Sequence, residues 1–458
     1  MGIFFQRFAL TALCVPLAAP AWADDGGRLA AAEQQLAAIR HELAEMAAAP
    51  SMRAGHNAPA AAVRRSLDDG RFTLASADGD FSVSLRGTVQ FDAGYFSQGR
   101  NPAGVDLNSG TNFRRAYFGL EGTAWRDWSY NIAYNFGGSG TEKSGYLYRA
   151  YVEYDGAQPF AVRIGAFSPF TGIEDATGGT NLPFLERPTA ATIARGIAGG
   201  SGRQGIELFA QGRTYLVSLA YTGAKTNESG TFDEQQAVVG RAAWLAVDQD
   251  RLKWLLNLDA THVLKLADTA PGPAPSGFVR LEAGPEISVD GIQTLDTGAL
   301  SARHVTEFGL ESAVDAGRLF GQGGWFHYAV DRGGALADAG FSGWYVMAAF
   351  SLTGEPRLYD AGTASFHNPV PVAPLGKGWG AWEVAARFSH TNLNDAAGTP
   401  AALGGVAGGI QDVWSTGVNW YPNRPLRFML DYANIQVRQA GTATLTANAV
   451  AMRSQIAF

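Results

Sequence analysis

The feature that most constrains this chain is an alternation of apolar and polar residues that begins near Phe72 and recurs to the C-terminus. In residues 81–91, FSVSLRGTVQF, the apolar side chains occupy one parity and the polar side chains the other. Successive side chains of a β-strand point to opposite faces, so each such segment has one apolar and one polar face. The pattern returns in residues 115–121, 148–154, 382–388 and 426–432, and in the second of these Tyr148 falls on the apolar parity and Arg149 on the polar one. The sequence therefore predicts an all-β protein.

Two all-β architectures share this pattern: a soluble sandwich or propeller, whose apolar faces point inward, and a transmembrane barrel, whose apolar face points at lipid. Segments of about ten residues, the length that a tilted strand needs to cross a bilayer, favour the barrel. Short turns such as residues 421–425 alternate with long Gly/Ala/Pro/Asn stretches such as residues 97–111 and 394–410, which is typical of outer-membrane barrels.

The ends of these segments and of the chain also favour a barrel. Tryptophans and other aromatic residues gather at the expected strand ends, where interfacial girdles lie in membrane proteins; they include Trp125, Trp128, Trp325, Phe326, Trp379, Trp382, Trp420 and Tyr421. The last segment, residues 450–458, is amphipathic and ends in Phe458, which resembles the assembly signal of outer-membrane barrels. About 390 residues follow the N-terminal part, enough for a transmembrane antiparallel β-barrel of about 16 strands with a water-filled lumen.

The first residues predict export. Residues 1–23 combine Arg7, an apolar stretch over 8–19 and an Ala-Trp-Ala ending, the organisation of a secretory signal peptide. Downstream of it, no run of 18 or more apolar residues offers a transmembrane helix. The single cysteine, Cys14, lies within this signal, which excludes a disulfide scaffold or a zinc cluster in the mature chain.

Between the signal and the strands, two short regions precede the barrel. Residues 24–50 carry a heptad seam, with Leu29, Leu36 and Leu43 spaced by seven, which predicts a short coiled-coil helix. Such a helix is too short to be stable alone, so it either associates with sister chains or is an Ala-rich amphipathic helix without a partner. Residues 51–71 are rich in Ala and Pro and predict a linker, so that the barrel domain covers residues 72–458.

Several function classes are excluded or disfavoured. The net charge of −7 does not provide the basic field of a nucleic-acid-binding protein. The seven histidines are scattered without metal-ligand spacing, and Gly-x-Ser-x-Gly and His-Glu-x-x-His motifs are absent from the sequence. Residues 200–205 spell Gly-x-Gly-x-x-Gly, but a strand-like run follows them instead of a helix. We therefore expect no enzyme activity, no cofactor and no metal.

A set of motifs resembles the phosphate-selective porin O and P family from about residue 80 to the C-terminus. They occur in the family's order: residues 112–122 (NFRRAYFGLEG), 125–130 (WRDWSY), 165–175 (GAFSPFTGIED), 184–187 (FLER), 341–345 (FSGWY), 352–357 (LTGEPR) and 380–387 (GAWEVAAR). The resemblance implies a 16-stranded homotrimer with an arginine-lined lumen, and it implies that residues 167–187 form a constriction loop folded inward. It also implies that Arg114, Arg115 and Arg187 contribute to that lumen.

Three positions depart from the family's phosphate porins. Asp175 stands where they carry a lysine after the loop's Gly-Leu-Glu, and Ser129 replaces the lysine of Arg-Asp-Trp-Lys. In the strand that corresponds to their arginine-dense segment, residues 278–286, only Arg280 is basic.

The candidate anion-binding residues follow from parity and from the resemblance. Arginine makes up 30 of the 35 basic residues, and its planar guanidinium suits carboxylate and phosphate, although a GC-rich genome would produce the same bias. The lumen-facing candidates are Arg115, Arg149, Arg280, Arg387 and Arg427, and the structural alternative is that barrel arginines pair with cross-strand carboxylates such as Glu121, Glu153, Glu383 and Asp431.

The loop residues complete the prediction. Arg187 ranks first for function, while Glu174, Asp175 and Glu186 are expected to make the constriction mixed in charge. Arg114 lies on the apolar parity, which predicts a strand end or a subunit interface for it.

These observations predict an outer-membrane, homotrimeric diffusion porin for small hydrophilic solutes with a preference for anions. The resemblance implies inorganic phosphate or polyphosphate as substrates. The expected partners are outer-membrane lipid, the barrel assembly machinery and small anionic solutes, with the N-terminal helix in the periplasm and no nucleic acid. An exported soluble β protein that binds glycans or peptides is the alternative, and a barrel enzyme would need a carboxylate, His and Ser cluster that the sequence does not supply.

Overall fold

The computed structural model describes residues 63–68, 71–99, 105–137, 145–228, 233–268, 277–333 and 336–458. The predicted signal peptide, the heptad helix and residues 51–62 of the predicted linker lie outside these described residues. None of the described helices is long and apolar enough to cross a membrane.

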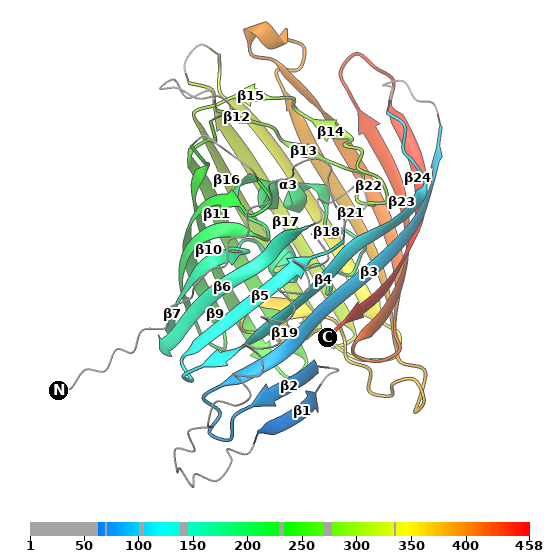
Figure 1. Cartoon of the computed structure of the whole chain (residues 1–458). Helices are drawn as coiled ribbons and strands as arrows, with labels where there is room; N and C mark the ends of the chain where they lie inside the picture. The colour runs from blue at the N-terminus through cyan, green and yellow to red at the C-terminus, as the bar shows by residue number, and fades with distance from the viewer. Residues whose placement is uncertain are drawn as a thin grey trace, which may run out of the picture. The chain divides into compact units, whose positions relative to one another are not determined.

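The described strands form a closed antiparallel barrel (Figure 1). Sixteen of them make up its wall: β3 (Ser82–Gln98), β4 (Gly110–Ala124), β5 (Trp128–Asn135), β6 (Tyr146–Ala157), β7 (Phe160–Phe167), β8 (Arg203–Gln211), β9 (Tyr215–Lys225), β10 (Gln236–Gln249), β11 (Leu252–Lys265), β16 (His304–Ala316), β17 (Leu319–Asp331), β18 (Ala339–Ser351), β21 (Ala381–Asp395), β22 (Val406–Tyr421), β23 (Leu426–Arg438) and β24 (Leu445–Ala457). The last strand, β24, pairs with the first, β3, and closes the ring. The predicted fold class is confirmed.

A short hairpin precedes the barrel wall. Strand β1 (Arg64–Asp68) pairs with β2 (Arg71–Ala75), and β2 continues onto the start of β3. The end of the predicted linker at residues 51–71 therefore contains a strand, β1, whose backbone groups are paired by β2.

The two faces of the wall differ in the way that the alternation predicts. Leu208 is 58% exposed on the outside whereas its neighbour Glu207 is fully buried on the inside, and Leu430 and Asp431 differ in the same way. Large aliphatic and aromatic side chains are exposed on the outer face of the strands, so the outside is the apolar surface that a lipid-embedded barrel needs.

The connections separate into two rims, as predicted, with one exception. One rim carries the short turns at residues 125–127, 158–159, 212–214, 250–251, 317–318 and 422–425. The exception is the connection between β18 and β21, residues 352–380, which starts at this rim but is long. The backbone N–H of Leu352 donates to Trp382 O at 2.8 Å and that of Leu375 donates to Pro422 O at 2.7 Å, which ties the segment to β21 and to one of the short turns.

The aromatic residues at the short-turn rim form a girdle around Trp382 and Trp420, whose rings stack at 5.6 Å. Both indole N–H groups donate to the carbonyl of Trp379. Trp325 and Phe326, which were predicted to belong to a girdle, lie in the middle of β17. Trp325 is exposed on the outer face and Phe326 is buried in the lumen.

Three connections fold into the lumen. Residues 168–202 contain α2 (Ile173–Ala176) and α3 (Thr189–Ala198), and α3 lies inside the barrel (Figure 1). Residues 277–303 contain β12 (Phe278–Val279), β13 (Glu282–Ala283), β14 (Leu295–Asp296) and β15 (Leu300–Ser301), while residues 352–380 contain β19 (Leu358–Asp360) and β20 (Ser365–His367). The remaining described helix, η1 (Ala401–Leu403), lies in the loop between β21 and β22.

These segments pack mainly against one side of the wall. Helix α3 contacts β10, β11, β16, β17, β18 and β21, and side chains such as Ile173, Phe184, Leu295 and Phe366 are buried between the segments and the wall. The lumen beside these strands is therefore filled, and the open space lies beside β4, β6, β7 and β9.

Candidate functional site

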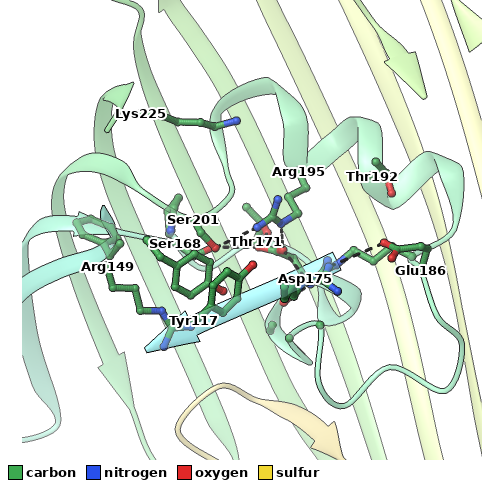
Figure 2. Close-up of a pocket in the computed structure, with 18 of the residues that line it drawn as sticks. Tyr117, Arg149, Ser168, Thr171, Asp175, Glu186, Thr192, Arg195, Ser201 and Lys225 are labelled. Carbon is green, nitrogen blue, oxygen red and sulfur yellow. Dashed lines mark hydrogen bonds and ion pairs between the residues drawn. The ribbon is translucent and has the colours of Figure 1, made fainter. Parts of the chain in front are cut away.

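A cavity of about 710 Å³ lies between the inward loop, residues 168–202, and the wall strands β4, β6 and β7. Figure 2 shows Tyr117 and Arg149 on the wall side of this cavity, with Asp175 and Arg195 on the loop opposite. Among the described residues that line it, seven are basic and five are acidic: Arg114, Arg115, Arg149, Arg163, Arg187, Arg195 and Lys225 against Asp175, Glu186, Glu228, Glu282 and Glu286. The cavity lining is therefore mixed in charge with a basic excess.

A β-bulge in β4 turns two consecutive arginines toward this cavity. Gln90 of β3 pairs with Arg115 and the next residue, Phe91, pairs with Phe113, so that Arg114 is the extra residue of the bulge. The guanidinium of Arg114 binds Glu186 of the loop in bidentate geometry, at 2.8 and 3.0 Å. The prediction that Arg114 lies at a strand end or a subunit interface is therefore wrong, because the bulge shifts the parity of the strand.

Arg115 lies next to the loop backbone. Its Nη1 donates to Gln90 Oε1 at 2.6 Å, and its Nη2 lies 3.9 Å from Glu186 Oε2. A Cβ atom at Gly179 of the loop would lie 2.7 Å from Arg115 Cζ, so a side chain at this position would displace the guanidinium.

A second bulge occurs in β6. Ala133 of β5 pairs with Arg149, and Tyr134 pairs with Leu147, which leaves Tyr148 as the extra residue. Tyr148 and Arg149 both line the cavity, although parity placed Tyr148 on the outer face. The Tyr148 ring stacks on Tyr117 of β4 with centroids 3.9 Å apart.

The inward loop is held by wall arginines that donate to its main-chain carbonyls. Arg387 donates to Glu186 O at 2.8 Å, Arg427 to Leu182 O at 2.6 Å and Arg453 to Leu185 O at 2.6 Å. A loop inside a barrel has no ladder partner for its backbone groups, which must still be paired when they are buried.

Wall and lumen carboxylates bind the N–H groups of the same loop. Glu207 accepts from Phe170 N at 2.8 Å, Asp431 accepts from Leu185 N at 2.8 Å, and Glu286 accepts from Thr189 N at 2.7 Å. Buried charged groups thus satisfy both the donors and the acceptors of the loop.

Arg387 and Arg427 do not pair with carboxylates on neighbouring strands, which was the alternative role considered for the barrel arginines. Arg387 pairs with Glu286 of the second inward segment at 2.7 Å, and Arg427 donates to carbonyl and amide oxygens, including Asn419 Oδ1 at 2.9 Å. Glu383 instead pairs with Arg357 at 2.7 Å. The inward segments provide partners that neighbouring strands would otherwise supply.

Arg187 and the loop acids form a network within the loop. Arg187 donates to the carbonyls of Glu174 and Asp175 at 3.2 and 3.4 Å and lies 3.5 Å from Asp175 Oδ1. Asp175 is also paired with Arg195. Arg187 therefore lines the cavity and at the same time holds the loop together.

The three loop carboxylates titrate differently. Burial acts to raise the pKa of each. The charges of Arg195 and Arg187 outweigh burial at Asp175, so the pKa of Asp175 is lowered. The charges of Arg114, Arg115 and Arg453 outweigh burial at Glu186, so the pKa of Glu186 is lowered as well. Glu174 faces Gln322 of the wall, and burial prevails there, so its pKa is raised.

The structure places Arg280 away from the other candidates. It lies between β12 and β13, its side chain is 55% exposed, and it pairs with Glu282 and Asp296 rather than lining the cavity.

Several arginines of the lumen were missed in the sequence, among them Arg163 and Arg195, which line the cavity. Arg453 lies on the polar parity of the last strand, where it binds Asp92 in bidentate geometry, and Arg357 ends the 352–357 motif. Parity would have found Arg453, but no local signal distinguishes Arg357.

Phe458 lies at the closing seam of the barrel. Its backbone exchanges two hydrogen bonds with Gly87 of β3, at 2.9 and 3.0 Å. Among the residues described, no group of three or more His, Cys, Asp or Glu side chains is arranged to hold a metal ion.

Comparisons with known proteins agree with this geometry. A family model described as "Phosphate-selective porin O and P" matches residues 83–458. Porin O of Pseudomonas aeruginosa is 27% identical over 385 residues, covering 79% of this chain and 85% of the relative. An uncharacterized protein of Caulobacter vibrioides is 24% identical over 369 residues, covering 79% of this chain and 70% of the relative.

Among solved structures, in-vitro folded OmpT, an outer membrane protein of Vibrio cholerae, has a TM-score of 0.50 at 8% identity, covering 83% of this chain and 98% of that one. This likeness concerns the fold alone. The resemblance seen in the motifs is confirmed, and the apolar outer face decides against the soluble alternative. The chain is an outer-membrane porin and belongs to the phosphate-selective porin O and P family.

Proposed function

We propose that this porin conducts small hydrophilic solutes with a preference for anions. The observation that carries the proposal is the basic excess of the cavity lining, with seven basic against five acidic side chains among the residues described. Fixed cations beside a narrow aqueous path raise the local concentration of anions, because low-dielectric walls focus the field.

Inorganic phosphate and polyphosphate are the family-related substrates that we propose within this class. The loop carries Asp175 where the family's phosphate porins carry lysine, but Arg187 and Arg195 both pair with it and compensate its charge. A moderate anion preference, rather than a strict one for phosphate, agrees with a lining in which most arginines already have carboxylate partners.

The first test is the reversal potential of the purified porin in planar bilayers under a KCl gradient. Replacing Arg187→Ala should lower the chloride-to-potassium permeability ratio, because it removes a fixed cation and one of the partners of Asp175. One screened unit charge corresponds to about 0.5–1 kcal/mol, which is roughly a two- to fivefold change in the ratio.

Arg126→Ala is the matched control, because Arg126 is exposed, pairs with Asp80 on the short-turn rim and lies outside the cavity lining. It should leave the ratio unchanged. A cation preference in the unmodified porin would end the anion proposal, and an unchanged ratio in the Arg187 variant would remove that residue from it.

The assembly proposals follow from the family. We propose a homotrimer inserted by the barrel assembly machinery, with residues 24–50 as a periplasmic helix and without catalysis. Native mass spectrometry in detergent of the full chain and of a chain without residues 24–50 measures the contribution of that helix to trimer formation.

A further inference from the structure

Arg149 differs from the other arginines that line the cavity. Arg114, Arg115, Arg163, Arg187 and Arg195 each have a carboxylate within 4 Å. In the part of the chain that the structure describes, Arg149 has neither an ion pair nor a hydrogen bond, and its side chain is only half-buried. Its guanidinium lies over the Tyr148 ring, whose centroid is 5.2 Å from the guanidinium carbon.

Tyrosines surround this guanidinium. Tyr117 and Tyr148 stack at 3.9 Å with their planes 17° apart, and Tyr146 and Tyr151 line the same stretch of the cavity. The bulge at Tyr148 creates this arrangement, because it turns Tyr148 and Arg149 into the lumen together. Figure 2 shows Tyr117 and Arg149 side by side on the wall, with the loop opposite.

We propose that Arg149, Tyr117 and Tyr148 form a binding site for carboxylates that carry an aromatic ring, of the benzoate class. The guanidinium fork matches a carboxylate in bidentate geometry, and the tyrosine rings offer a flat apolar surface for stacking. The cavity of about 710 Å³ is wide enough for such a ligand with its water.

The tyrosines distinguish this class from compact oxyanions. A small, strongly hydrated anion interacts only with the charge of Arg149. A carboxylate that carries an aromatic ring also stacks on the tyrosine rings and is expected to bind more tightly. The proposal rests on the proposed function to the extent that the cavity lies on the solute path, but its ligand class is argued from these three side chains alone.

The test measures block of the KCl current through the full-chain porin in planar bilayers by benzoate, with acetate as the carboxylate that lacks a ring. Benzoate should block at concentrations at which acetate does not. Tyr148→Leu should weaken benzoate block about three- to tenfold, the amount that an aromatic pair contributes, and leave the response to acetate unchanged. Arg149→Gln should weaken it at least about tenfold, because a charge-assisted bond is lost.

Further variants separate binding from folding. Tyr148→Phe keeps the ring and should keep the block, and Arg149→Lys should give an intermediate value because it keeps the charge without the fork. Arg126→Gln, at an exposed ion pair on the short-turn rim, should behave as the unmodified porin. Each variant must insert into the bilayer as an open channel that conducts KCl without benzoate, which demonstrates a folded barrel.

Equal block by benzoate and acetate, loss of block in Tyr148→Phe, or a Tyr148→Leu effect equal for both carboxylates would overturn the proposal. These outcomes are separate from the failure of the proposed function. A cation-selective reversal potential would end the anion preference, and a benzoate block that depends on Arg149 and Tyr148 would still support the site.

Discussion

At the residue scale, the arginines of the lumen differ by the atoms that they contact rather than by their charge. Arg387, Arg427 and Arg453 bind loop carbonyls and are buried, so their main effect is to hold the inward loop in place. Arg149 lies on the same polar parity of its strand but, among the described residues, has no carboxylate within ion-pair distance and lies over the Tyr148 ring, which is why we propose that it binds a solute. An inventory of arginines in such a lumen therefore overestimates the number available to anions.

Glu186 gives a prediction at this scale. Its pKa is lowered because the charges of Arg114, Arg115 and Arg453 outweigh burial, so Glu186 stabilises the folded loop at pH above its ordinary pKa of 4.5. That contribution is lost only as the pH falls through the lowered pKa. The single-channel current of the unmodified porin should therefore show little open-channel noise from pH 7 to about pH 4 and more noise in stronger acid. The Glu186→Gln variant should show that higher noise already at pH 7.

Glu282→Gln is the matched control, since Glu282 lines the same cavity but pairs with Arg280 of the second inward segment. It should change the ion selectivity without adding noise. A transition to noisy current at pH 5 or above in the unmodified porin would contradict the assignment.

At the element scale, the inward loop is connected to the wall by paired charges. Arg453 of β24 binds both oxygens of Asp92 on β3, at 2.7 and 2.6 Å, and reaches Leu185 O and Glu186 of the loop. One side chain thus joins the closing strand, the opening strand and the constriction.

Arg453→Gln should destabilise the barrel by about 3–5 kcal/mol, because it leaves buried carboxylates without their partner. Unfolding in urea, followed by the heat-dependent mobility of the barrel on gels, measures the effect. Adding Asp92→Asn should restore part of the loss. Arg438→Gln should cost at most about 1 kcal/mol, because the Arg438 side chain that pairs with Asp412 is exposed to solvent. Equal losses in the two arginine variants would contradict this prediction.

At the scale of the whole molecule, closure of the ring depends on the seam between β24 and β3. Gly87 exchanges two backbone hydrogen bonds with Phe458, and a Cβ atom at Gly87 would lie 2.3 Å from Phe458 Cζ. The terminal ring therefore packs over a glycine and covers the seam at its end.

Gly87→Val should displace that ring and lower the stability of the closed barrel by about 1–3 kcal/mol, the usual cost of overpacking. The loss of stability is measured by refolding each variant into detergent and determining the fraction that migrates as compact, heat-modifiable barrel on gels. Gly110→Val is the control, because nothing lies within 4 Å of a Cβ atom at that strand glycine. Equal yields for the two variants would show that the seam tolerates the added methyl groups.

Local patterns predicted much of this molecule, and the errors have specific causes. Alternation identified the strands and their outward faces. The positions of Arg114 and Tyr148 were wrong because a bulge adds one residue without changing the sequence pattern. The inward fold of residues 352–380 was not foreseen, because its partners, such as Asn181 and Arg241, come from distant parts of the chain.

The amino-acid sequence by itself determined the barrel, its oily exterior and its family, because these depend on side-chain periodicity along each strand and on local motifs. Only the tertiary structure decided which arginines face open water, because that depends on which loop carbonyls and carboxylates reach each guanidinium inside the closed ring. Charge is a property of a residue, whereas its availability is a property of its neighbours.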